Sequence, residues 1–225
     1  MKPILGALLL VPCLSAAALA QEPTADAKQG RFYLEGGIGF GVASMALDAG
    51  SSKGFNSEPV FAAGFAAEYG ITDQIGVFTK FGFVDVLHNN PAATTIGMTF
   101  DGAFKVIEKK GDAAGLSAYA GLGFVNIDID PKGGPSDDAT DFVFELGVQG
   151  DFGPGDTWSL QPFVQIQLVA GSRPFSGYNG VLQVSAGVKL LYKLTDNLFL
   201  EPSVVFTGGN FQDSVLFGVG IQLRL

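Results

Sequence analysis

The side chains that could carry catalysis are scarce in this chain. His88 is the single histidine and Cys13 the single cysteine. A nucleophilic site needs its histidine held by a carboxylate within hydrogen-bonding reach. Asp85 precedes His88 by three residues, which in a strand places the two side chains on opposite faces. We therefore expect no catalytic residues and no cofactor, with His88 solvated in an exposed loop.

A second concentration of chemically active side chains is acidic. Oxygen-rich loops can hold calcium, but an EF-hand loop needs a glutamate at its twelfth position. Counting from Asp128, that position holds Ala139, and the fifth position holds Lys132 instead of an acid. We therefore expect a solvated acidic loop over 128–141 and no dedicated metal site. The aspartates concerned are Asp128, Asp130, Asp137, Asp138 and Asp141.

The charge balance excludes one class of partner. The formal net charge is −9, and only 16% of the residues are charged, while 47% are hydrophobic. An acidic surface repels phosphate backbones, so we expect no nucleic acid partner. The hydrophobic content also excludes a disordered acidic chain.

Residues 1–20 have the pattern of a signal peptide. Lys2 precedes an apolar run over residues 4–11, and Ala18-Leu19-Ala20 matches a small-x-small cleavage site before Gln21. The run is short for a spanning helix, so a membrane anchor is the weaker alternative. A lipoprotein signal at Cys13 is also a weaker alternative, because Pro12 stands where such signals have a small residue. We expect cleavage after residue 20, a flexible lead-in over 21–30 and one domain over 31–225.

The elements that must position any site are strands. From Arg31 onward the hydrophobic period is two, as at the C-terminus, where Val219, Ile221 and Leu223 alternate with Gly220 and Gln222. Tight connections alternate with longer ones, which is typical of an antiparallel up-and-down meander. The segments lie near 31–44, 59–70, 75–87, 95–107, 116–129, 140–152, 158–170, 179–193, 198–207 and 214–225.

Strand length and sidedness favour a closed transmembrane β-barrel over a soluble sandwich. Eleven residues at ~3.4 Å each, tilted by ~40°, span roughly 28 Å, about the apolar band of an outer membrane. The face opposite the apolar one is rich in glycine, which suits strands that curve around a narrow axis. Aromatic residues gather toward segment ends: Phe32, Phe61, Tyr69, Phe100, Phe142, Phe152, Trp158, Tyr178, Tyr192 and Phe206.

The polar residues on the glycine-rich face would line the lumen. They carry both signs of charge, so we expect them to pair structurally and to plug the barrel. The candidates are Glu35, Glu68, Lys80, Lys105, Glu145, Gln149, Gln165, Gln167, Lys189, Glu201 and Arg224.

Two copies of one turn motif carry a resemblance. Residues 69–75 and 192–198 each begin with a Tyr, which is followed by a Thr-Asp pair three and four positions later. Through this motif the chain resembles the OmpA-like small outer-membrane barrels of Gram-negative bacteria. This resemblance implies the outer membrane as location and insertion by the barrel-assembly machinery. Members of that family usually have eight strands. Residues 194–225 add a hairpin, so ten strands are expected here and eight are the alternative.

Three functions are compatible with such a barrel. The first is a monomeric structural or surface-interaction barrel, whose external loops contact their surroundings and whose wall contacts outer-membrane lipid and lipopolysaccharide. The second is a narrow porin for small solutes. The third is a barrel enzyme, resembling the lipid A deacylases or the omptin proteases, for which the scarcity of catalytic side chains is unfavourable.

Overall fold

The chain folds as ten long strands. The computed structural model describes residues 28–45, 57–87, 92–130, 137–154, 156–170, 181–209 and 212–225. Every strand begins and ends within three residues of a predicted segment. Among the described residues no helix is long and apolar enough to cross a membrane. The strands are β1 (Phe32–Met45), β2 (Ser57–Gly70), β3 (Ile75–Val86), β4 (Ala92–Ile107), β5 (Gly115–Asp130), β6 (Asp137–Asp151), β7 (Trp158–Ala170), β8 (Val181–Lys193), β9 (Leu198–Gly209) and β10 (Gln212–Arg224).

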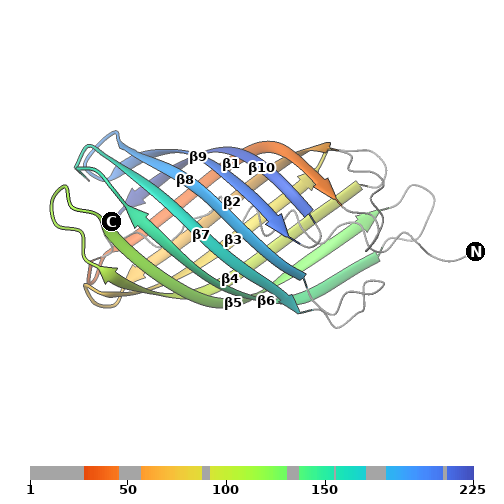
Figure 1. Cartoon of the computed structure of the whole chain (residues 1–225), viewed down its shortest axis with the longest axis horizontal. Coiled ribbons are helices and arrows are strands. Elements are labelled where there is room, and N and C mark those ends of the chain that lie inside the picture. Colours follow the sequence, from red (N-terminus) through yellow and green to blue (C-terminus); the bar gives the residue numbers. More distant parts are fainter. Residues whose placement is uncertain are drawn as a thin grey trace, which may run out of the picture.

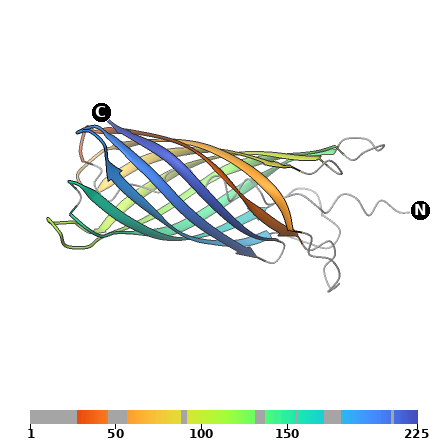
Figure 2. The same ribbon diagram turned by 90° about the horizontal axis from the view of Figure 1, so that it is seen from above.

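The strands close into a single barrel. Each strand pairs antiparallel with its neighbour in sequence, and β10 returns to pair with β1 from Tyr33–Arg224 to Met45–Gln212 (Figures 1 and 2). The C-terminal hairpin is therefore part of the wall, and the ten-strand prediction is confirmed over the eight-strand alternative. A closed barrel leaves no unpaired strand edge, so backbone groups are satisfied between neighbours, as a membrane interior requires.

The strands are strongly tilted because their pairing is staggered. Tyr33 pairs with Glu68, and the row of paired residues continues through Asp101 and Glu145 to the far side of the barrel. Strand tilt and stagger are coupled in any closed barrel, and the tilt is evident in Figure 1. Inward-facing residues on adjacent strands therefore form oblique rows across the inner wall.

The repeated turn motif forms the same structure twice. Ile71 and Leu194 each donate a backbone hydrogen bond of 2.9 Å, to the carbonyl oxygens of Ile75 and Leu198 respectively. In both turns the amide of the following threonine donates to the same oxygen. These turns lie at the barrel end that also holds the chain's C-terminus, here called the tight-turn end (Figure 1).

The last residues of the expected lead-in are bonded to the tight-turn end. The Gly30 amide donates to the Gly70 carbonyl at 2.9 Å, and the Gln29 amide to Oδ1 of Asp73 at 3.1 Å. Residues 1–27, which hold the expected signal peptide and the rest of the lead-in, lie outside the described residues.

The two faces of the wall are the reverse of those in a water-soluble protein. In β7, the buried positions hold Gln161, Gln165 and Gln167, while the exposed positions hold aliphatic residues. Ile166 is 43% exposed and Leu168 is 52% exposed. Apolar residues are exposed without penalty when the surrounding medium is lipid, so the outer face is the membrane face.

Most of the described aromatic residues lie where the sequence places them. Phe32 pairs with Tyr69 and Trp158 with Tyr192, all exposed at the tight-turn end. Phe100 is an exception, because it lies midway along β4. It is 53% exposed on the outer face, where a lipid medium accepts any large apolar side chain. Tyr178 lies outside the described residues.

The expectation of an acidic loop over 128–141 is wrong in its bounds. β5 continues to Asp130 and β6 begins at Asp137, with Asp128 paired opposite Asp138. Asp141 is buried on the inner face, opposite Val125. The aspartates at the end of β5 alternate with isoleucines, so the strand continues through them. The connection between β5 and β6 is therefore limited to residues 131–136, which lie outside the described residues.

Candidate functional site

The interior of the barrel is the candidate site, because it collects the polar residues. Of the eleven side chains expected in the lumen, only Lys105 and Arg224 are half-buried. The other nine are at most 3% exposed: Glu35, Glu68, Lys80, Glu145, Gln149, Gln165, Gln167, Lys189 and Glu201.

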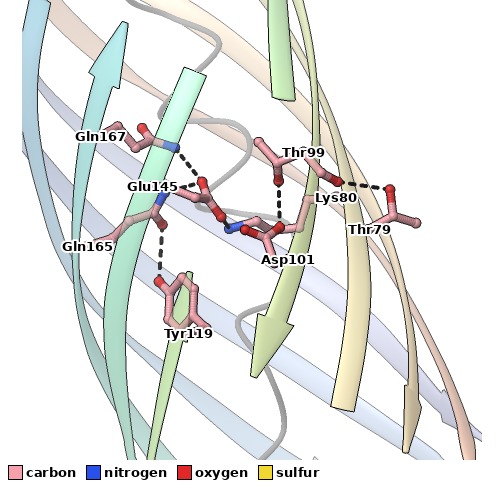
Figure 3. A network of polar contacts seen from close by, with 8 residues as sticks. All are labelled: Thr79, Lys80, Thr99, Asp101, Tyr119, Glu145, Gln165 and Gln167. Atoms are coloured by element: carbon pink, nitrogen blue, oxygen red, sulfur yellow. Dashed lines mark hydrogen bonds and ion pairs between the residues drawn. The ribbon is translucent and has the colours of Figure 1, made fainter. Parts of the chain in front are cut away.

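One buried cluster joins β3, β4, β6 and β7; we call it the Lys80 cluster. Lys80 forms an ion pair with Glu145, and both side chains are fully buried (Figure 3). Gln165 and Gln167 each donate an amide hydrogen bond to Oε2 of Glu145, at 2.8 and 2.9 Å. A buried charge is tolerated only when it is paired and hydrogen-bonded, and Glu145 meets both conditions.

A glycine allows a second carboxylate to join this cluster. Asp101 on β4 pairs with Gly121 on β5, which in turn pairs with Glu145 on β6. An ideal Cβ at Gly121 would lie only 1.7 Å from Oδ1 of Asp101. The Asp101 side chain therefore occupies the place of the side chain that Gly121 lacks, and it points across β5 toward β6. Its other oxygen accepts a 2.8 Å hydrogen bond from the Thr99 hydroxyl.

A second glycine has the same function for an aromatic ring. Tyr119 on β5 lies over Gly147 on β6, where a Cβ would be 2.2 Å from the phenol oxygen. The Tyr119 hydroxyl thereby reaches Oε1 of Gln165 on β7, at 3.3 Å. The same ring lies 5.1 Å from Nζ of Lys80, and the Phe78 ring lies 5.4 Å from it. The lysine is thus held by a carboxylate and by two aromatic faces.

The opposite wall holds a corresponding cluster on β8, β9 and β1; we call it the Lys189 cluster. Nζ of Lys189 lies 3.2 Å from Oε1 of Glu35 and 3.1 Å from Oε1 of Glu201. All three side chains are at most 3% exposed. The pair between β8 and β1 crosses two intervening strands, so it connects separate parts of the wall.

The two clusters share one layout. In each cluster the lysine pairs with a hydroxyl residue on the next strand. Two residues nearer the tight-turn end of that next strand, an acidic residue pairs with a glycine on the strand after it. A second acidic residue lies on the strand that follows the glycine's strand around the barrel, Glu145 on β6 and Glu35 on β1. Lys80 on β3 and Lys189 on β8 are five strand positions apart around the ten-strand barrel, so the two lysines lie on opposite walls. The matching residues are Lys80, Thr99, Asp101 and Gly121 in one cluster, and Lys189, Ser203, Glu201 and Gly220 in the other.

A third cluster surrounds Asp151 near the tight-turn end. Oδ1 of Asp151 lies 2.5 Å from both Nζ of Lys109 and the Ser159 hydroxyl, and Gln161 donates to Oδ2 at 3.2 Å. The β6–β7 pairing is interrupted beside this cluster, because Pro162 has no N–H to contribute, and it resumes between Phe152 and Leu160. The Asp151–Gln161 hydrogen bond links the two strands where the backbone ladder is interrupted.

The tight-turn end of the lumen is lined by an arginine on aromatic rings. The Arg224 guanidinium carbon lies 4.0 Å from the Phe199 ring centre and 5.9 Å from that of Tyr33. Its Nε donates to Oε1 of Gln222 at 2.9 Å. Stacking explains why a half-buried arginine is stable here.

The structure describes only some of the side chains considered for covalent chemistry. His88 lies outside the described residues, and Asp85 accepts a 3.4 Å hydrogen bond from Thr94. In the described part of the chain, no three His, Cys, Asp or Glu side chains converge as metal ligands. Both amide atoms of Gln149 and of Gln183 are buried without a hydrogen-bond partner. Such groups are satisfied by water or by a polar solute.

The list of expected lumen residues omitted several inward residues, although the same alternation places them on the inner face. Asp101 has the parity of Lys105 on its strand, and Asp151 has that of Glu145. Gln161, Gln183 and Gln222 are likewise buried at inward positions. The inner wall is therefore more amide-rich than expected.

Comparisons with known proteins agree with this architecture. The model of a family described as the outer membrane protein beta-barrel domain matches residues 6–162. No curated protein sequence matches the chain. The translocator domain of the autotransporter NalP from Neisseria meningitidis is similar in fold, with a TM-score of 0.53, 9% identity, and 95% of this chain and 93% of that chain covered.

A second solved structure shows the same likeness. The beta domain of the Bordetella autotransporter BrkA has a TM-score of 0.50 and 12% identity, covering 85% of this chain and 98% of that chain. At these identities the similarity concerns the fold.

Proposed function

Because this chain belongs to the outer membrane protein beta-barrel domain family, we propose that it is a structural or surface-interaction barrel with a largely closed lumen. The family and the lipid-adapted outer wall indicate the outer membrane of a Gram-negative bacterium as its location. Activity then depends on what the loops and the wall contact rather than on chemistry within the barrel.

The observation that carries this proposal is the pair of buried ion clusters. The Lys80–Glu145 and Lys189–Glu35 pairs each join strands that are not neighbours. Their side chains are at most 2% exposed, so these contacts occupy the interior from both walls. Barrels with open aqueous channels have about 16 strands, whereas ten strands leave a lumen that side chains can fill.

We place the tight-turn end in the periplasm and the longer connections outside the cell, as in barrels whose turns are short on one side. The contacts proposed are outer-membrane lipid and lipopolysaccharide at the wall, external partners at the long connections, and the barrel-assembly machinery during insertion. The barrel is proposed to act as a monomer. Export is proposed to remove residues 1–20, and mass spectrometry of the mature protein should find Gln21 at its N-terminus.

Conductance measurements test the closed lumen. Purified protein that shifts in mobility between unboiled and boiled samples on SDS gels, and so is a folded barrel, is inserted into planar bilayers. We expect no ohmic single-channel steps from the wild type, with a known porin as the positive control. Regular steps from the wild type would contradict the closed lumen.

A narrow porin is the second candidate, and one observation favours it. The unpartnered amides of Gln149 and Gln183 indicate a wetted part of the inner wall. Steps that change size when Gln183 is replaced by leucine would assign the conductance to this lumen. A barrel enzyme is the third candidate, and loss of a measured hydrolytic activity on His88→Ala would be required to support it.

A further inference from the structure

The membrane-facing wall is hollowed near the long-connection end of β8, β9, β10 and β1. The open groove there has a volume of about 540 Å³. Val42 pairs with Val215, Val215 with Phe206, and Phe206 with Ala186, so one row of outward residues crosses all four strands. The apolar side chains that line the groove are Val42, Val184, Ala186, Phe206 and Val215.

The hollow exists because two small residues interrupt an otherwise bulky surface. Ala186 contributes only a methyl group, and Gly208, which pairs with Val184, contributes no side chain. A Cβ built at Gly208 would lie 3.3 Å from Oδ1 of Asp213. The absent side chain therefore opens the groove directly beside a carboxylate.

Asp213 makes this groove amphipathic. It is exposed, lies one residue from the start of β10, and forms no ion pair with any described lysine or arginine. Ala186 and Phe206 lie further from the long-connection end, toward the middle of the wall. A molecule in the groove would thus have its apolar part at membrane depth and its head at the carboxylate.

We propose that this groove binds a single-chain amphiphile with a protonated amine head group. The chain would lie against Phe206 and Val184, and the ammonium group would pair with Asp213. An anionic head group would be repelled by the same carboxylate, and a neutral one would gain no ion pair. The proposal requires that the outer wall faces lipid, but it is independent of whether the lumen conducts.

Three probes of equal chain length test the charge preference: dodecylammonium, dodecanol and dodecanoate. Their dissociation constants are measured by native mass spectrometry of the full mature barrel in a nonionic detergent. We expect dodecylammonium to bind about two- to fivefold more tightly than dodecanol, as an exposed ion pair allows, and dodecanoate to bind most weakly. Asp213→Asn should remove the difference between the amine and the alcohol.

A second pair of variants tests the location. Gly208→Leu fills the groove, and because Gly208 does not have a positive φ, the new side chain adds no backbone strain. We expect it to weaken all three probes. Val164→Leu, at an outward position on β7, is the matched control and should leave all three unchanged.

The outcomes are distinguishable from failure of the fold. Each variant must keep its heat-modifiable mobility, and Ala186→Leu replaces Gly208→Leu if the latter does not fold. Equal affinity for the three probes, or a preference that survives Asp213→Asn, would mean apolar partitioning only and would overturn the proposal. So would tighter binding of dodecanoate, or binding unaffected by a filled groove.

Discussion

Replacing Gly121 by alanine tests whether the lumen glycines exist to let side chains reach past a strand. Gly121 stands between Asp101 and Glu145 in one row of paired residues. A Cβ there would lie 1.7 Å from Oδ1 of Asp101 and 2.6 Å from the Phe100 carbonyl oxygen. The Asp101 carboxylate can swing away, but the backbone carbonyl can move only if β4 shifts.

The cost has two sources. Inserting a methyl group into a filled interior costs about 1–3 kcal/mol. Displacing Asp101 also weakens its 2.8 Å hydrogen bond with Thr99, and a typical hydrogen bond contributes about 0.5–1.5 kcal/mol. We therefore expect Gly121→Ala to lower the free energy of unfolding by about 2 kcal/mol or more. This corresponds to roughly a 30-fold change in the unfolding equilibrium.

The matched control is Gly102→Ala, on the outer face of β4. A Cβ at Gly102 meets nothing within 4 Å, and the residue is exposed. This change should be neutral or stabilise slightly, because it only restricts the unfolded chain. Both variants are compared with the wild type by urea unfolding in lipid vesicles. The folded fraction is measured from the heat-modifiable mobility on gels. Equal stability of the two alanine variants would refute the account of the inner glycines.

Three further predictions follow from other parts of the barrel. Lys80→Met leaves Glu145 buried without its cation and should lower the free energy of unfolding by about 3 kcal/mol or more. Part of this stability should be regained in the double variant Lys80→Met/Glu145→Gln. No loss of stability in the single variant would contradict a paired role for Lys80. Val219→Arg places a charge at a lipid-facing site that is 46% exposed and should cost about 2–4 kcal/mol in membrane-inserted protein, whereas normal insertion would show this face to be wrongly assigned. In the 194–197 turn, the hydrogen bond and charge of Lys193, 2.9 Å away, hold the pKa of Asp196 below its usual value. The pair therefore stabilises the turn at pH values above the pKa of an unfolded Asp. This stabilisation is lost as the pH falls through the lower pKa of Asp196 in the folded protein. An NMR titration should show the pKa of Asp196 rising in Lys193→Met, and an unchanged value would contradict the pairing.

Much of the fold could be predicted because a strand's period is local. Alternation along residues 158–170 places Gln165 and Gln167 on one face without reference to any other strand. The same local argument identifies Lys80, Glu145 and Lys189 as inward residues. The turn motif at 69–75 and 192–198 is also local, since its hydrogen bonds close within five residues. Bounds were least predictable at the long connections, where β4 and β6 each begin three residues before the predicted segments.

The partners of the inward residues depend on the closed barrel. Lys80 and Glu145 are 65 positions apart in the chain, and Lys189 and Glu35 are 154 apart. Their meeting requires the register of every intervening strand pair and, for the second pair, the closure of β10 onto β1. Asp101 reaches past β5 only because Gly121 falls at the facing position, which no local pattern specifies.

The outer groove has the same origin. Gly208, Ala186 and Asp213 are unremarkable within their own strands, and they form a hollow only when β8, β9 and β10 are placed side by side. The sequence by itself therefore determined the number of strands, their faces and the membrane as their solvent, because these depend on periodicity and hydrophobicity. Only the tertiary structure decided which charges pair and where the wall is hollow, because both depend on register between strands that are distant in the chain.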